Sequence, residues 1–103
     1  MNASDNSSVL TDVVSKVIAV GGSAFEVEYK HPDERVFAFS GPVGVGVAAY
    51  RSGTPEAQRL RKELSALRRR RKKITVSGVE YVLRVEVFDS FGEHAFRVTL
   101  QRS

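Results

Sequence analysis

Apolar residues recur at helical spacing in two segments of the chain, one near its start and one in its middle. In the first segment, they follow one another as Leu10, Val13, Val14, Val17 and Ile18, which is the spacing of one helix face. Ser8 or Thr11 is a suitable N-cap, and Gly21-Gly22 is a suitable stop. This predicts a helix over residues 9–20. Because β-branched residues dominate the segment, a strand over Val17–Val20 is the alternative.

The second segment has the strongest local helix signal. Thr54-Pro55-Glu56 supplies an N-cap, a proline at the first helical position and an acid near the positive end of the helix dipole. A narrow apolar stripe follows, formed by Ala57, Leu60, Leu64 and Leu67. The basic residues after the stripe extend the predicted surface helix over residues 54–73, with one edge buried.

Elsewhere the apolar positions alternate with a period of two, as in strands with one buried face. The turn His31–Arg35 separates two such runs and predicts a hairpin whose core side carries Phe25, Val27, Tyr29, Phe37 and Phe39. Alternation resumes over residues 74–76, 79–87 and 94–100, with turns at residues 77–78 and 89–93, and it places His94 on the core side. The glycine-rich segment Gly41–Gly53 is interpreted as a connector that begins with a short edge strand.

Together these elements predict an α+β fold: an antiparallel sheet of about four to six strands, packed on one face by the basic helix 54–73 and by a helix over residues 9–20. A chain of 103 residues suffices for one compact domain, so we expect a flexible tail over residues 1–7 and a single domain over residues 8–103. The sequence has no cysteine and no apolar run long enough to span a membrane. We therefore expect a soluble cytoplasmic protein without a membrane partner.

The charge is concentrated in one segment. The whole chain has a formal net charge of +4, but Arg59–Lys73 alone carries +8 and the other 88 residues carry −4. Like charges along a helix repel, and a polyanion would turn that repulsion into attraction. Arginine also suits bidentate contacts with phosphate. The predicted nucleic-acid-binding residues are Arg59, Arg61, Lys62, Arg68, Arg69, Arg70, Arg71, Lys72 and Lys73.

No pattern typical of an enzyme is present. The two histidines, His31 and His94, form no metal-binding pair, and the glycines of residues 41–46 do not match the spacing of a phosphate-binding loop. Most aromatic residues fall on the core phase of their strands, which leaves Tyr50, Phe88 and Phe91 as aromatic candidates for ligand contact. We therefore predict no catalytic residue, no metal site and no cofactor.

These features favour a small non-enzymatic binding protein that contacts nucleic acid or ribonucleoprotein through the basic helix 54–73. The alternative is a protein–protein interaction module or homodimer that docks an acidic protein surface on the same helix. Both hypotheses use the same basic residues, so the position of those residues in the fold is the first thing to establish.

Overall fold

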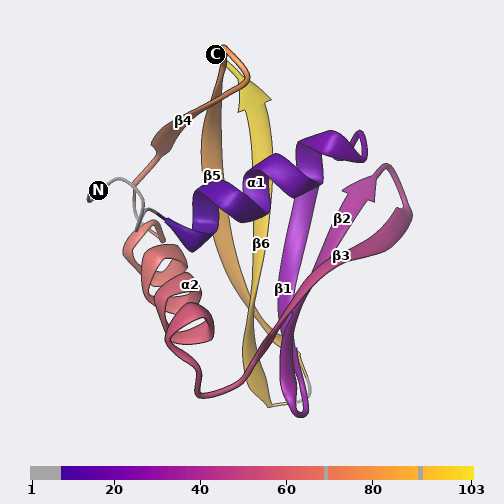
Figure 1. Cartoon of the computed structure of the whole chain (residues 1–103), viewed down its shortest axis with the longest axis vertical. Coiled ribbons are helices and arrows are strands. Elements are labelled where there is room, and N and C mark those ends of the chain that lie inside the picture. The colour runs from indigo at the N-terminus through magenta and orange to yellow at the C-terminus, as the bar shows by residue number, and fades with distance from the viewer. Residues whose placement is uncertain (1–7, 69, 91) are drawn as a thin grey trace.

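Two helices cover one face of a six-stranded antiparallel sheet (Figure 1). The computed structural model describes residues 8–68, 70–90 and 92–103, so the predicted tail over residues 1–7 lies outside the described residues. Along the chain the elements are α1 (Val9–Ala19), β1 (Ala24–Lys30), β2 (Asp33–Ser40), β3 (Val43–Arg51), α2 (Pro55–Ala66), β4 (Lys72–Val76), β5 (Val79–Ser90) and β6 (Glu93–Arg102). The predicted α+β class is confirmed.

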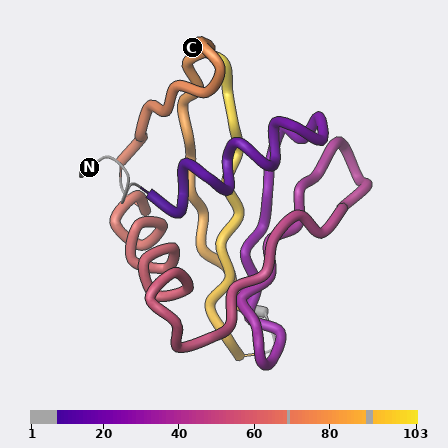
Figure 2. Tube along the Cα trace, in the orientation of Figure 1, coloured from indigo at the N-terminus to yellow at the C-terminus, as the bar shows by residue number. Residues whose placement is uncertain are grey.

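The sheet consists of two three-stranded meanders joined side by side. Its strand order is β3-β2-β1-β6-β5-β4, so β1 and β6 lie in the centre and β3 and β4 form the edges. The short strand β4 pairs with β5 only as far as Lys72 opposite Leu83. From Arg84 onward, β5 therefore has no neighbouring strand on its outer side in the described sheet (Figure 2).

The core lies between the helices and the sheet. Its fully buried side chains come from both layers and include Leu10, Val13, Val14, Val17, Phe25, Val27, Val36, Leu60, Leu64, Leu83 and Val98. Each large apolar side chain contributes about 1.5–3 kcal/mol when it leaves water. This exceeds the few tenths of a kcal/mol by which valine disfavours a helix. Burial therefore explains why residues 9–19 form a helix and not the alternative strand.

The predicted helix over residues 54–73 is wrong at its C-terminal end, because α2 stops at Ala66. The apolar stripe that ends at Leu67 would continue at Arg71, so a longer helix would turn an arginine toward the core. Instead, tight backbone hydrogen bonds close the last turn: the Arg68 amide donates to Ser65 and the Arg70 amide to Leu67, each at 3.3 Å. Lys72 and Lys73 already belong to β4.

The predicted phase of β2 is also wrong. Val36 and Ala38 are buried beneath the helices, whereas Phe37 and Phe39 point to the opposite face and are half-buried. The turn that follows α1 lies close to the sheet here, because a Cβ atom added to Gly22 would be 3.2 Å from the Cβ atom of Ala38. A small residue fits under this turn and a phenylalanine does not. The phase predicted for β1 is confirmed for Phe25 and Val27.

Two further expectations at strand ends need correction. The side chain of His94 is 74% exposed and not on the core side, because it lies at the start of β6, whereas Phe96, Val98 and Leu100 are buried as predicted. The segment interpreted as a connector is mostly strand, since β3 occupies nine of its residues. Its backbone pairs with β2 along the whole of that strand.

Candidate nucleic-acid interface

The basic residues predicted to bind nucleic acid are divided among three parts of the fold. Arg59, Arg61 and Lys62 lie in α2, whereas Arg68, Arg70 and Arg71 lie in the connection between α2 and β4, and Lys72 and Lys73 begin β4. Arg69 lies outside the described residues. The prediction of one continuous basic helix face is therefore wrong, and the residues have different environments.

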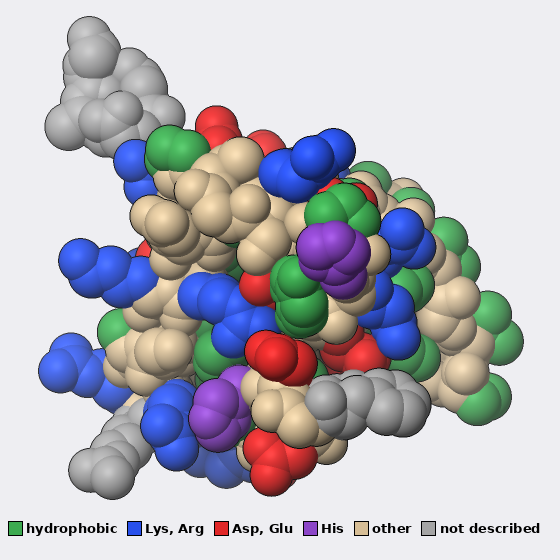
Figure 3. Space-filling model, turned by 90° about the horizontal axis from the view of Figure 1, so that it is seen from below, with side chains coloured by type: hydrophobic (Ala, Val, Ile, Leu, Met, Phe, Trp, Pro, Cys, Tyr) green, Lys and Arg blue, Asp and Glu red, His purple; other side chains and the backbone are tan. Residues whose placement is uncertain are grey.

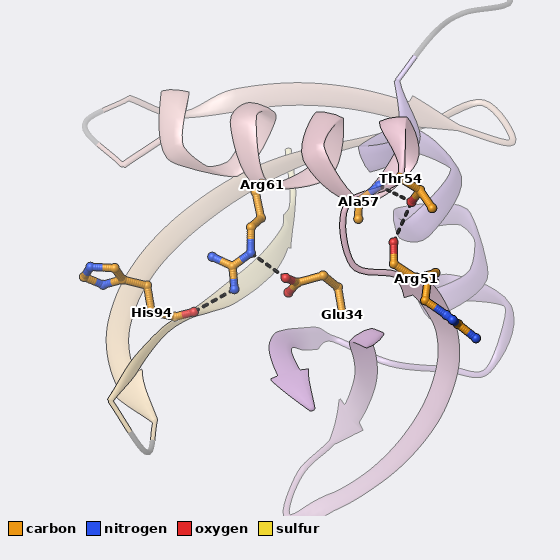
Figure 4. Close-up of polar contacts among 6 residues, drawn as sticks. All are labelled: Glu34, Arg51, Thr54, Ala57, Arg61 and His94. Atoms are coloured by element: carbon orange, nitrogen blue, oxygen red, sulfur yellow. Dashed lines mark hydrogen bonds and ion pairs between the residues drawn. The ribbon is translucent and has the colours of Figure 1, made fainter. Parts of the chain in front are cut away.

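Arg61 points inward and holds α2 to the sheet (Figure 4). Its Nε donates a hydrogen bond to Glu34 Oε2 at 2.8 Å, and its Nη2 donates to the carbonyl oxygen of His94 at 3.0 Å. The guanidinium also lies 5.5 Å from the centre of the Phe96 ring. Because Glu34 is only 4% exposed, this arginine neutralises a buried carboxylate. It is a structural residue and is not available to a phosphate.

The exposed basic residues after α2 surround a hollow with a volume of about 320 Å³. Its lining consists of Leu67, Arg68, Arg70, Arg71, Arg84 and Val85. A second hollow of about 400 Å³ shares Leu67, Arg70 and Arg71 and adds Glu63, Ala66 and Lys72. We call Arg68, Arg70, Arg71, Lys72 and Arg84 the basic cluster. Basic side chains project from the side of the molecule that carries α2 (Figure 3).

No described carboxylate lies within ion-pair distance of the basic cluster, although Glu63 lines the second hollow. None of its five residues forms an ion pair with a described carboxylate, whereas Lys73 lies 3.9 Å from Glu80. Glu63, the only acid in the basic segment, accepts a hydrogen bond from the Leu10 amide at 3.1 Å and so helps to cap α1. Two guanidinium groups about 6 Å apart repel by about 0.7 kcal/mol in bulk water. The cluster is therefore a site of uncompensated positive charge.

Arg84 is the functional candidate that the sequence reading missed. It lies on the exposed phase of β5, where it resembles any polar residue of an alternating strand. The hairpin register nevertheless contained a signal: the turn at Ser77-Gly78 pairs Lys72 with Leu83, so the residues one position beyond that last pair, Arg71 and Arg84, come near each other and line the same hollow. Reading the turn as a register, and not only as a break, would have found it.

The remaining chemical candidates do not extend this site. Phe88 is partly exposed and Phe91 lies outside the described residues. The Tyr50 hydroxyl is buried without a hydrogen-bond partner in the described chain, and burial, together with the carboxylates of Asp12 and Glu56, raises its pKa. These carboxylates line a separate hollow beside α1, and their negative charge would repel phosphate.

Among the described residues, no group of three or more histidine, aspartate or glutamate side chains is placed to hold a metal ion. No described helix combines the length and apolar character that crossing a membrane requires. No protein-family model matches the sequence, and no curated protein matches it either. The geometry of the basic cluster is therefore the basis for assigning a function.

Proposed function

We propose that this protein is a small non-enzymatic binding protein that contacts the phosphates of nucleic acid, free or within a ribonucleoprotein, through the basic cluster. The observation that carries the proposal is the hollow lined by Arg68, Arg70, Arg71 and Arg84, none of which has a carboxylate partner among the described residues. Like charges held together in this way repel, and a polyanion relieves the repulsion. The energetic balance therefore favours an anionic ligand.

Arginine suits this ligand for a geometric reason as well. The planar guanidinium presents paired N–H donors that match two phosphate oxygens, so it binds phosphate in a fixed orientation. The described residues of the connection after α2 form turns and not a regular helix, so their side chains do not follow one helix face. This arrangement lets neighbouring arginines reach different phosphates along a strand.

The salt dependence of binding follows from the number of phosphates contacted. Contacts from all five residues of the basic cluster give a slope of about −4.5 in log affinity against log salt for a duplex, or about a 500-fold loss between 50 and 200 mM salt. Arg61 contributes nothing to this slope because Glu34 already neutralises it. The outward residues of α2, Arg59 and Lys62, add to the general positive potential of this side.

A charge-reversal experiment tests the proposal. The double variant Arg70→Glu/Arg71→Glu is expected to lose at least about 100-fold in affinity for a nucleic-acid oligomer in a mobility-shift assay at low salt, because two charges that line the hollow reverse sign and its net charge falls by four. The matched control is Arg35→Glu/Arg102→Glu, since both arginines are exposed and the change in net charge is the same. Unchanged affinity of the first variant, or equal losses in both, would exclude the basic cluster.

One observation favours a second candidate, an acidic protein partner at the same place. The outer edge of β5 from Arg84 onward has no strand beside it in the described sheet, and an extended acidic segment would add there as a strand next to the arginines. Absorbance separates the two candidates, because a protein with three tyrosines and no tryptophan absorbs weakly at 280 nm. Nucleic acid retained after purification at low salt supports the first candidate; an acidic protein retained without it supports the second.

A further inference from the structure

The edge of the sheet opposite the basic cluster is formed by β3, whose first eight residues carry no charge. Strand β3 spans nine residues, and the chain has no charged residue from Gly41 to Tyr50. The side chains of Val43 and Val45 are 62% and 49% exposed, among the most exposed large apolar residues described. Hydrophobic side chains line the margin of the molecule on this side (Figure 3). An apolar strand with unpaired backbone groups is therefore open to another chain.

Natural sheets protect their edges against such pairing, commonly with short strands and lysines. The other edge of this sheet follows that rule, because β4 has five residues and begins with Lys72 and Lys73. Strand β3 has neither protection along Val43–Gly46. The β-bulge that leaves Val47 without a direct partner on β2 interrupts regular pairing only after this stretch. Residues 43–46 are thus a regular part of the edge that is exposed and carries no charge.

We propose that β3 pairs antiparallel with β3 of a second copy of this chain, around a two-fold axis perpendicular to the sheet. Such an axis keeps the helices of both copies on the same face and places residues of equal phase opposite each other. With the axis at Gly44, Val43 faces Val45 of the second copy and the two copies of Gly44 face each other. With the axis at Val45, the two valines meet instead, so valine faces valine in either register.

The glycines make the other face compatible with the same pairing. The ring of Phe39 lies against Gly44 so closely that a Cβ there would be 2.7 Å from a ring carbon. The ring of Phe37 lies on the same face beside Gly46, where an added Cβ would be 3.9 Å from the nearest ring carbon. A second copy brings glycines to this face as well, so its side chains do not collide with these rings. A strand with larger side chains at these positions would fill the space beside the rings of Phe37 and Phe39.

Charge also favours a second copy as the occupant. Two uncharged edges meet without repulsion, and Arg51 at the end of β3 has Asp33 of its own chain 3.7 Å away. The basic cluster lies at the opposite edge of the sheet, so the positive charges of the two copies stay far apart. A strand of alternating valine and glycine also offers no charged group by which to select an acidic or basic partner.

Light scattering coupled to gel filtration tests the dimer. The wild-type protein is expected to show about twice the 11.4 kDa mass of one chain, at low and at high salt, because no ion pair holds the interface. Val45→Lys is expected to give the mass of one chain, since in either register it replaces a valine contact between the copies with a charged side chain and brings two like charges near the axis. The matched control Thr75→Lys, on the exposed face of β4, is expected to remain a dimer.

Hydrogen exchange supplies a second measurement on the same strand. Amides of residues 43–46 are expected to exchange slowly in the wild type and at least about ten times faster in Val45→Lys; Val43→Lys replaces it if circular dichroism shows that the first variant is unfolded. A wild-type mass of one chain at every concentration would overturn the proposal. So would a dimer that survives both lysine variants, dissociates with salt, or grows into larger species.

Discussion

Both edges of this sheet have backbone N–H and C=O groups without a strand partner in the described chain, but their side chains differ in charge. At the β4 edge, lysines and arginines surround the unpaired strand groups, whereas the β3 edge carries only glycine, valine and alanine before Tyr50. A positively charged edge resists pairing with a strand of like charge and attracts an anion. An uncharged edge permits pairing with a similar strand and does not attract an anion. The difference is the basis for proposing different classes of partner for the two edges, and each edge can be altered without the other.

A second contrast lies within the basic segment itself. Arg61 and Arg70 are nine positions apart and would have equal weight in any count of charge. Arg61 is half-buried and paired with the buried Glu34, whereas Arg70 is exposed and lines the hollow. The function of an arginine here depends on the depth at which the fold places its guanidinium.

The largest expected effect separates these two arginines. Arg61→Ala leaves the carboxylate of Glu34 buried without its partner, and loss of one member of such a pair costs about 3 kcal/mol. Arg70→Ala removes an exposed side chain that forms no ion pair with a described residue, so the free energy of unfolding is expected to change by less than about 0.5 kcal/mol. Urea denaturation measures both. Equal losses in the two variants would contradict the structural role of Arg61.

The next effect concerns the glycines of the uncharged edge. Gly44→Ala is expected to destabilise the fold by about 1–3 kcal/mol, because its new methyl group collides with the Phe39 ring. Gly46→Ala meets nothing closer than 3.9 Å and is expected to be neutral or slightly stabilising. Both are best compared by thermal unfolding in the Val45→Lys background, where association does not contribute. A larger loss for Gly46→Ala would refute the proposed ring contact.

A smaller effect concerns Tyr50, where β3 meets the core. The hydroxyl has a pKa raised above its ordinary value of 10.0, chiefly by burial. Above pH 10 the unfolded chain loses this proton while the folded chain retains it, so stability falls as the pH rises toward the folded pKa. Tyr50→Phe is expected to weaken this alkaline loss and to gain up to about 1 kcal/mol near neutral pH, since the buried hydroxyl has no partner in the described chain.

Melting curves of Tyr50→Phe and wild type at neutral pH and above pH 10 check this expectation. The two proteins should differ more at alkaline pH than at neutral pH. An identical pH dependence would show that the titration of this hydroxyl does not contribute to stability.

The smallest effect concerns repulsion at the charged edge. Arg71→Gln is expected to stabilise the protein by a few tenths of a kcal/mol at low salt, because it removes one charge from the basic cluster. Added salt screens the same repulsion, so the difference in melting temperature is expected to disappear at high salt. Thr75→Gln on β4 is the matched control and should show no such salt dependence. A stabilisation that persists at high salt would point to a cause other than charge.

Much of the local structure followed from short patterns in the sequence. The start of α2 was predicted by Thr54-Pro55, and the structure confirms that the threonine side chain accepts from the Ala57 amide. The buried phase of β5 and β6 followed from alternation, as Leu83 and Val98 show. These predictions succeeded because a cap or a repeated spacing depends on neighbours within a few residues.

What only the tertiary structure decided was which face of each element is covered and which distant residues meet. The crossing of α1 over Ala38 turned the two phenylalanines of β2 outward, although alternation alone fits either phase. Packing between elements decides three further features in the same way: where α2 ends, the pairing of Arg61 with Glu34, and the proximity of Arg84 to Arg71. The sequence alone determined the periods of the elements and the concentration of charge, because both are local properties. The roles of the charges required the fold, because burial and neighbours across strands are set by contacts between residues far apart in the chain.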